Sequence, residues 1–166
     1  MTPFVHATPV RFADVDHAGI VYYPRFFHLF HLAFEELWRT RIGPRAYAEL
    51  IDRDRIGFPA VRAECEFLAP LRFGDTAEIE VTVSRLGGKS ITFRYRVHRA
   101  AEEARAGGAA SEAPALARPR ALAAEGQVVC AVVDLARFVA VAVPERVIAL
   151  LDDLVEREAE HPGAEK

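Results

Sequence analysis

The segment 11–27 brings together residue types that could perform acyl chemistry. Two aspartates, Asp14 and Asp16, stand two residues apart, and a His-Ala-Gly sequence at 17–19 follows them. After an apolar Ile-Val-Tyr-Tyr run, Pro24 is typical of the first turn of a helix. A carboxylate can attack a carbonyl or activate water, and unpaired N–H groups at a helix start can stabilise negative charge. The segment therefore predicts a site where a carboxylate acts beside a helix N-terminus.

A long and almost wholly apolar helix is expected to follow, from Pro24 to about Arg41, with Gly43-Pro44 ending it. At about 100° per residue, most of its circumference is apolar. Its broad face holds Phe26, Phe30, Ala33, Phe34, Leu37 and Trp38, and its narrow polar stripe holds His28, His31, Glu35 and Arg39. A helix with so little polar surface must be covered, and we expect a sheet to cover it.

Five stretches are predicted to be strands: 5–12, 59–68, 76–86, 89–99 and 124–139. The three central stretches alternate apolar and polar residues with a period of two, which indicates strands buried on one side. Gly87-Gly88 is typical of a two-residue hairpin turn. Helices are expected at 45–55 and from Pro144 to about Glu158. This order predicts an α+β fold with an antiparallel sheet curled around the first long helix.

The chain of 166 residues is expected to form one domain, 1–166. The Ala-rich stretch 100–123 has no strong period, so we expect a mobile loop there, and a frayed tail at 159–166. A net charge of −3 gives no basic field for nucleic acid. No apolar run is long enough to span a membrane, and the N-terminus lacks the pattern of a signal peptide. Cys65 and Cys130 lie in apolar runs and are expected to be buried, reduced thiols. We therefore expect a cytoplasmic protein.

The stretch Asp14-Val15-Asp16-His17-Ala18-Gly19-Ile20-Val21-Tyr22-Tyr23-Pro24 resembles the signature of hot-dog-fold acyl-CoA thioesterases, specifically the 4-hydroxybenzoyl-CoA thioesterase and YbgC-like group. The resemblance extends to Gly57-Phe58-Pro59, to Phe73-Gly74-Asp75 and to Gly87-Gly88-Lys89-Ser90. It covers roughly residues 5–140, apart from the Ala-rich insertion. It implies hydrolysis of an acyl-CoA thioester to a free acid and CoA.

The resemblance also implies roles for particular residues. The second aspartate of the pair, Asp16, is catalytic in that group, and the backbone N–H at the position of Tyr23 polarises the thioester carbonyl. The residues alone leave open whether Asp16 is the nucleophile or the general base. Asp14 is expected to be a structural neighbour. The group forms dimers with active sites at the subunit interface, usually assembled into tetramers, and it needs no metal and no cofactor other than the CoA of the substrate.

Further residues are expected to contact the substrate: His17, Gly19, His31, Phe58, Lys89 and Ser90. Members acting on hydroxybenzoyl groups carry an acidic residue where this chain has His31, and two arginines where it has Gly87-Gly88. Lys89 is therefore the main candidate for holding CoA, with Arg85 beside it. The acyl group stays open between small, medium-chain and aromatic.

Other functions fit some of the same residues. A hot-dog hydratase or dehydratase pairs a histidine with an acid across its site, whereas Asp16 and His17 are adjacent here. A protein of the same fold could also hold acyl-CoA or an acyl carrier protein without turnover. His28, His31 and Glu35 have a spacing compatible with metal ligands, although a polar stripe at an interface or cleft explains them more simply.

Overall fold

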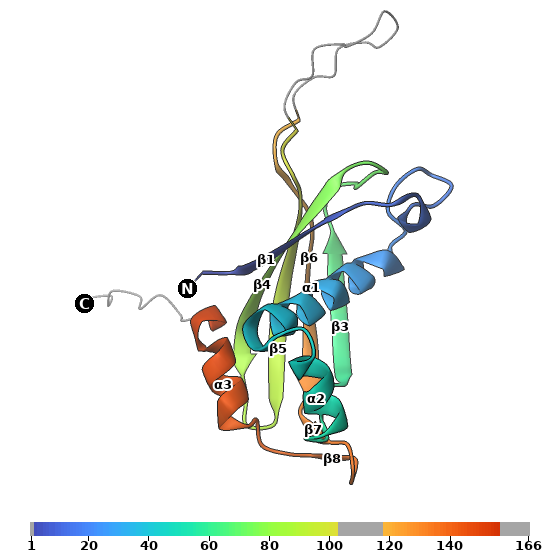
Figure 1. Ribbon diagram of the computed structural model, residues 1–166. Helices are drawn as coiled ribbons and strands as arrows, with labels where there is room; N and C mark the ends of the chain where they lie inside the picture. Colours follow the sequence, from blue (N-terminus) through green and yellow to red (C-terminus); the bar gives the residue numbers. More distant parts are fainter. Residues whose placement is uncertain (1, 103–117, 157–166) are drawn as a thin grey trace, which may run out of the picture.

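The computed structural model describes residues 2–102 and 118–156, in which an antiparallel sheet curves around one long helix (Figure 1). The helices are α1 (Pro24–Ile42), α2 (Ala46–Asp52) and α3 (Glu145–Leu151), with 3₁₀ turns η1 (Phe12–Asp14) and η2 (Asp152–Leu154). The strands are β1 (Phe4–Pro9), β2 (Ile56–Gly57), β3 (Ala60–Phe67), β4 (Thr76–Leu86), β5 (Ser90–Arg99), β6 (Ala121–Ala131), β7 (Val133–Asp134) and β8 (Val139–Ala140). The predicted α+β class and hot-dog architecture are confirmed.

Five strands form the main sheet in the order β1-β4-β5-β6-β3, and every neighbouring pair is antiparallel. The short strands β2, β7 and β8 form a second sheet. The main sheet is ordered so that β3 lies at one edge and β1 at the other.

Helix α1 packs against the concave face of the main sheet and shares the core with the inner face of β4, β5 and β6. Its buried residues are Phe26, Leu29, Phe30, Ala33, Phe34, Leu37 and Trp38, which is the predicted apolar face. Phe30 stacks on Tyr95 of β5 with ring centroids 4.5 Å apart. Gly126 of β6 makes room for this ring, because a Cβ at Gly126 would lie 2.7 Å from Phe30 Cε2. The helix is therefore held close to the middle of the sheet.

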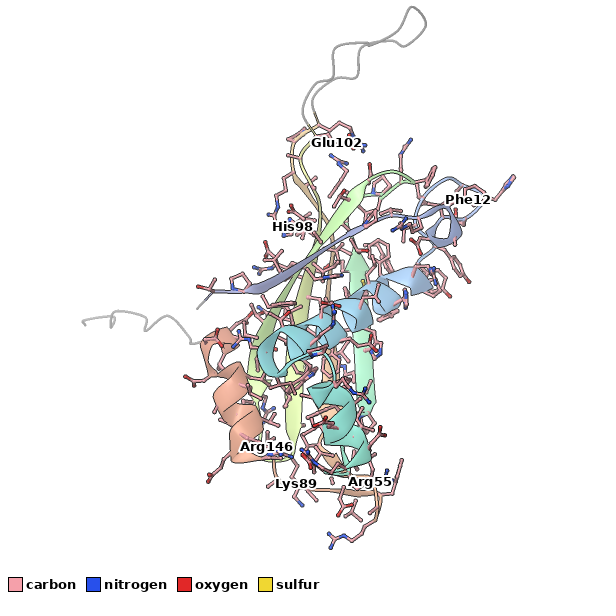
Figure 2. All side chains as sticks on the ribbon, in the orientation of Figure 1. Phe12, Arg55, Lys89, His98, Glu102 and Arg146 are labelled. Carbon is pink, nitrogen blue, oxygen red and sulfur yellow. The ribbon has the colours of Figure 1, made fainter. Side chains whose placement is uncertain are left out.

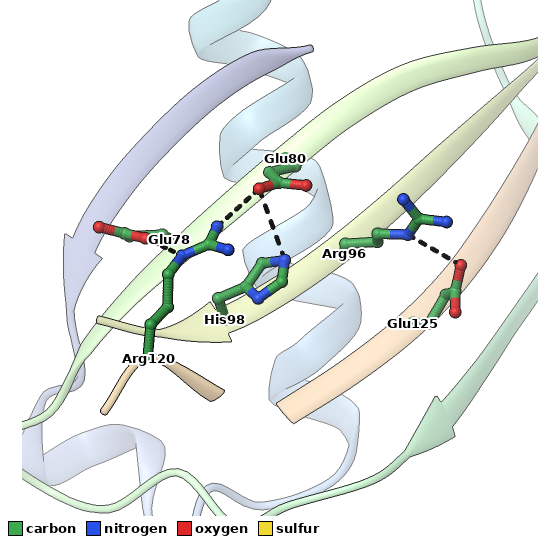
Figure 3. A network of polar contacts seen from close by, with 6 residues as sticks. All are labelled: Glu78, Glu80, Arg96, His98, Arg120 and Glu125. Carbon is green, nitrogen blue, oxygen red and sulfur yellow. Dashed lines mark hydrogen bonds and ion pairs between the residues drawn. The ribbon is translucent and has the colours of Figure 1, made fainter. Parts of the chain in front are cut away.

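The opposite, convex face of the sheet carries a network of charges (Figure 3). Arg120, just before β6, donates to Glu78 at 2.8 Å and to Glu80 at 2.6 Å, both on β4. His98 Nε2 lies 3.5 Å from Glu80 Oε1. Burial and the neighbouring Arg120 hold the pKa of His98 below its ordinary value. Burial opposes ionisation of Glu80, but the hydrogen bond from Arg120 and the charge of His98 outweigh it and lower the pKa of this carboxyl.

The long helix, the hairpin at Gly87-Gly88 and the three central strands lie where the pattern predicts them. The long helix ends at Ile42, where Gly43 adopts a φ of 99° and its N–H donates to the carbonyl of Arg39. The expected strand 5–12 is shorter, because Phe12–Asp14 forms a 3₁₀ turn. The helix expected at 45–55 spans Ala46–Asp52.

The single strand predicted at 124–139 is wrong. Strand β6 ends at Ala131, and Val133–Asp134 then pairs with β2 in the second sheet. The Asp134 side chain accepts hydrogen bonds from the N–H groups of Ala136 and Arg137 and so forms a turn. Phe138 takes a positive φ of 54° in this turn, and β8 then runs back along β7. The strand also starts earlier than predicted. Ala121 and Leu122 pair with Arg99 and His98, so residues 121–123 are strand rather than loop.

The closing helix is also shorter than predicted. It ends at Leu151, and after η2 the chain returns to the sheet, where the N–H of Glu156 donates to Val83 at 2.9 Å. Residues 103–117 of the expected loop, and the expected tail 159–166, lie outside the described residues.

Strand β3 differs from the expectation that it is buried on one side. Val61 is 65% exposed and Phe67 is 48% exposed, because β3 is the edge strand and has no neighbour on its outer side within the described sheet. Cys65 on this strand is half-buried, whereas Cys130 is buried as expected, and both thiols are free. Among the described helices, none is long and apolar enough to cross a membrane.

Candidate active site

The loop between β1 and α1 folds tightly around Asp16. The Asp16 N–H donates to Ile20, and its carbonyl accepts from the N–H of Gly19, both at 2.9 Å. Its carboxylate Oδ1 accepts from the N–H of Ala18 at 2.8 Å. Gly19 has a φ of 75°, a conformation that favours glycine and lets the loop turn back toward α1. It does not line the cleft described below. Among the described residues, nothing donates to Asp16 Oδ2, and one carboxylate oxygen is therefore available for chemistry.

Both carboxylate oxygens of Asp14, two residues earlier, accept hydrogen bonds within the fold. Its Oδ2 accepts from the N–H of Arg11 at 2.7 Å. Its Oδ1 accepts from Nε of Arg25 at 2.9 Å and from Nη2 at 2.5 Å. The Asp14 carbonyl also accepts from the N–H of Tyr22 at 2.9 Å. Asp14 therefore ties the loop to the first turn of α1, as expected of a structural neighbour.

Tyr23 lies immediately before α1, and its backbone N–H is an unused donor. Its neighbours in the chain are engaged, since Tyr22 donates to Asp14 and Arg25 donates to Tyr22. Pro24 has no N–H. In the part of the chain that the structure describes, the Tyr23 N–H donates to no acceptor. A donor left free at a helix start is suited to receive a carbonyl oxygen on which negative charge develops.

Asp16 and Tyr23 line the same cleft, which has a volume of about 550 Å³. The rest of its lining is apolar: Ile20, Val21, Phe26, Phe67, Leu68, Ala69, Pro70 and Leu71. The structure thus brings together the two residues expected to be catalytic. His17 is exposed on the same loop but does not line this cleft.

A second cavity of about 330 Å³ lies further along α1 and contains His31 and Phe58. It is lined by aromatic rings and small residues: Phe27, Phe30, Phe34, Tyr47, Pro59, Ala60, Ala63, Tyr95, Val128 and Cys130. We call this space the aromatic cavity. Burial raises the pKa of Tyr47 to about 12 and that of Cys130 to about 11, so both groups are neutral at physiological pH.

Sequence reasoning missed the contributions of Tyr47, Tyr95 and Cys130 to the aromatic cavity. The alternation along β5 correctly places Tyr95 on the inner face. Nothing in the sequence signals that Tyr47 of α2 folds against Trp38, with which it stacks at 6.0 Å.

Lys89 and Ser90 are not brought to Asp16 within one chain. They lie at the β4–β5 hairpin, at the opposite end of the molecule from Phe12 and the Asp16 loop (Figure 2). The N–H of Gly87 closes the hairpin by donating to the carbonyl of Ser90 at 2.8 Å. Lys89 and Arg85 are both exposed.

His31 Nε2 lies 3.1 Å from Oε1 of Glu35, one helical turn away. Its ring also stacks on Phe34 at 6.0 Å. Within residues 2–102 and 118–156, no three His, Cys, Asp or Glu side chains are grouped so that they could hold a metal ion. Of the polar stripe of α1, only His31 lines the aromatic cavity.

A long helix wrapped by an antiparallel sheet, with a carboxylate loop at the helix start, defines the hot-dog class of proteins. Residues 10–151 match the family model described as the thioesterase-like superfamily, and the chain belongs to this family.

Several proteins of known name are similar to it. The 1,4-dihydroxy-2-naphthoyl-CoA hydrolase of Synechococcus elongatus is 32% identical over 88 residues, 53% of this chain and 64% of that protein. The chain thus matches less than two thirds of that relative's length. A putative esterase of Aquifex aeolicus is 30% identical over 58% of this chain and 73% of its own length.

Solved structures agree on the fold. A gentisyl-coenzyme A thioesterase superposes with a TM-score of 0.67 at 26% identity, covering 89% of this chain and 98% of that one. A 1,4-dihydroxy-2-naphthoyl-CoA thioesterase from Synechocystis gives a TM-score of 0.71 at 22% identity, covering 96% and 99%.

Proposed function

We propose that this protein is an acyl-CoA thioesterase in which Asp16 and the Tyr23 N–H act on the thioester. The observation that carries the proposal is the pairing of one free carboxylate oxygen with one free backbone donor in a single apolar cleft. The family and the names of similar proteins support the same reaction.

The chemistry needs only these two groups and water. As a nucleophile, Asp16 Oδ2 attacks the thioester carbon while the Tyr23 N–H stabilises the oxyanion. The C–S bond breaks, the thiolate of CoA leaves and takes a proton from water, and hydrolysis of the resulting anhydride frees the acid. As a general base, Asp16 instead removes a proton from the attacking water. The proposal includes no metal and no cofactor besides the CoA of the substrate.

The acyl group that suits the aromatic cavity is a planar aromatic one. Its walls include rings in contact with one another, such as Phe30 and Tyr95 at 4.5 Å and Phe34 and Tyr47 at 5.8 Å. Aromatic rings pack well in offset or edge-to-face contact with such walls. His31 at the rim could contact a polar substituent on the ring, supported by Glu35.

The active form is proposed to be a homodimer, or a tetramer made of two such dimers, joined through β3. This edge strand has no neighbour on its outer side within the described sheet, and Val61 and Phe67 on it are exposed. The Phe67 end of β3 lies at the Asp16 cleft, and the Ala60 end lies at the aromatic cavity.

Two β3 strands paired antiparallel would therefore set the Asp16 cleft of one subunit beside the aromatic cavity and the Lys89 hairpin of the other. In this arrangement Lys89, with Arg85 and Ser90, holds the phosphates of CoA. The site needs both copies. Two free thiols and a CoA-linked substrate fit the proposed cytoplasmic location.

Free-thiol release from a panel of acyl-CoAs tests the activity. We expect Asp16→Asn to lower kcat by about 10²–10⁴-fold while substrate still binds, because the change removes charge but little volume. Asp52→Asn, which alters an exposed aspartate of α2, is the matched control. Equal rates for wild type and Asp16→Asn would refute the role of Asp16. Absence of thiol release from every acyl-CoA would favour a binding protein.

Subunit mixing tests the shared site. Asp16→Asn and Lys89→Glu homodimers should each be impaired. After mixing and exchange, about half of the dimers are mixed, and each has one intact composite site, so about a quarter of wild-type activity should return. If each site used residues of one chain only, mixing would restore nothing.

A further inference from the structure

Two phenylalanines beside the Asp16 loop are displayed to solvent and contact each other. Phe12 is 78% exposed and Phe73 is 62% exposed. Their rings meet edge to face, with centroids 6.0 Å apart. A folded chain gains nothing from exposing two adjacent aromatic rings, so such a pair commonly marks a contact surface.

Both rings are held outward by stiff turns. Phe12 begins the 3₁₀ turn η1, which is closed by the N–H of Asp14 donating to the carbonyl of Arg11 at 3.0 Å. Phe73 lies in a turn closed by the N–H of Asp75 donating to the carbonyl of Arg72, also at 3.0 Å. The glycine after Phe73 has a φ of 91°, which lets the turn close. The rings are therefore pre-organised for binding and lose little freedom when covered.

Each phenylalanine follows an exposed arginine whose charge is unpaired. Neither the Arg11 nor the Arg72 guanidinium has a hydrogen bond or ion pair with another described residue. The nearest carboxylates are already paired with other arginines: Asp14 forms an ion pair with Arg25, and Asp75 forms one with Arg118. The chain as a whole has a net charge of −3. Arg11, Phe12, Arg72 and Phe73 thus form a basic and aromatic patch on an acidic protein.

This patch adjoins the proposed thioester cleft. Arg72 directly follows Leu71, which lines the cleft and whose carbonyl accepts from the N–H of Val21 at 2.8 Å. Phe12 is four residues before Asp16, at the outer tip of the same loop (Figure 2). A macromolecule bound on the patch would therefore lie next to the cleft that Asp16 lines.

Resting on the proposed thioesterase activity, we propose that this patch docks an acidic acyl carrier protein that delivers its acyl group to Asp16. The phosphopantetheine arm of such a carrier presents the same thioester as CoA but lacks the nucleotide, so recognition must come from the carrier surface. Aromatic and arginine side chains are the types that dominate protein–protein contacts. Two unpaired arginines would steer an acidic carrier to this patch beside the cleft.

The test compares one acyl group on two carriers. Benzoyl groups are attached to CoA and to a purified acidic acyl carrier protein, and hydrolysis is measured for wild type, Arg11→Glu/Arg72→Glu and Phe12→Ser/Phe73→Ser. We expect the wild type to hydrolyse both substrates. Both double variants should raise KM for the benzoyl carrier by roughly tenfold or more, and the effect of the arginine change should shrink at high salt. KM for benzoyl-CoA should stay constant.

The controls are Arg45→Glu, which alters an exposed arginine beyond the C-terminal end of α1, and Phe138→Ser, which removes a ring that is 76% exposed. Circular dichroism checks that every variant folds. A wild type that ignores the benzoyl carrier, or variants with unchanged KM for it, would overturn the proposal. An equal rise for benzoyl-CoA would assign the patch to CoA instead, and a fall in oligomeric state would assign it to contacts between copies of this chain. If the wild type hydrolysed neither substrate, the proposed function itself would fail.

Discussion

The two cavities along α1 differ in what their walls can do. The cleft at the start of the helix holds a free carboxylate oxygen of Asp16 and the free N–H of Tyr23, on a loop closed by several backbone hydrogen bonds. The aromatic cavity further along is lined mainly by aromatic rings, with the neutral Tyr47 and Cys130 groups and one imidazole, His31. The difference separates reaction from recognition, and changes at the two places should therefore alter different kinetic constants.

The largest expected effect in this comparison comes from loosening the Asp16 loop without touching Asp16. Arg25→Met removes both hydrogen bonds that the side chain donates to Asp14. We expect kcat to fall by roughly 10–100-fold with little change in KM, because a displacement of about 1 Å misplaces the reacting groups. Arg25→Lys should restore part of kcat. A variant with normal kcat would mean that the loop holds its geometry without this ion pair.

Filling the aromatic cavity should have a smaller effect and a different signature. Val128 of β6 lines the cavity, and Val128→Phe would occupy part of its volume. We expect KM for benzoyl-CoA to rise about tenfold while KM for acetyl-CoA is unchanged. The control is Val129→Phe, since the next residue on the strand points to the other face of the sheet. Equal changes for both substrates would contradict a separate recognition site.

The smallest expected effect lies on the convex face, away from both cavities, and it concerns stability alone. The pKa of His98 is lower in the folded protein than its ordinary value of 6.5. As the pH falls, His98 is therefore protonated in the unfolded chain at a higher pH than in the folded protein. The free energy of unfolding decreases as the pH falls below 6.5. The pKa of Glu80 is also lowered in the folded protein, so its contribution to stability is likewise lost as the pH falls below the ordinary value of 4.5.

His98→Gln removes the first of these contributions and can still contact Glu80. The decrease in Tm between about pH 7.5 and pH 5.5 should be smaller in this variant than in wild type by about 2 °C. Glu78 and Arg120, the other charges that face His98, stay unchanged. An identical decrease in both proteins would show that His98 does not control the acid sensitivity.

The sequence predicts the elements whose pattern is set by local burial. Alternation along β4 and β5 is clean because both strands are central and bury every second side chain. The same alternation on β3 predicts a buried face, but β3 is an edge strand and Val61 and Phe67 on it are exposed in this chain. The end of β6 at Ala131 was missed because the apolar run continues through Val132 and Val133 into the second sheet, and the later turn depends on one side chain, that of Asp134.

The candidate site was predictable only where it is local in sequence. Asp16, Gly19 and Tyr23 lie within eight residues, and the motif places them together. The aromatic cavity combines Tyr47 of α2, Tyr95 of β5 and Cys130 of β6. No spacing links residues so far apart, and only the packed sheet and helix show that they meet.

The junction between β5 and β6 has one further consequence. Glu102 and Arg118 pair through two backbone hydrogen bonds of 2.9 and 3.0 Å, and Arg120 is fastened to β4 just beyond them. The ladder between the two strands is therefore closed before the intervening residues begin. Evolution could lengthen or shorten the chain at this point without shifting the strand register. For the same reason, an engineer could replace residues 103–117 with a short turn, or graft a binding module there, and leave the sheet intact.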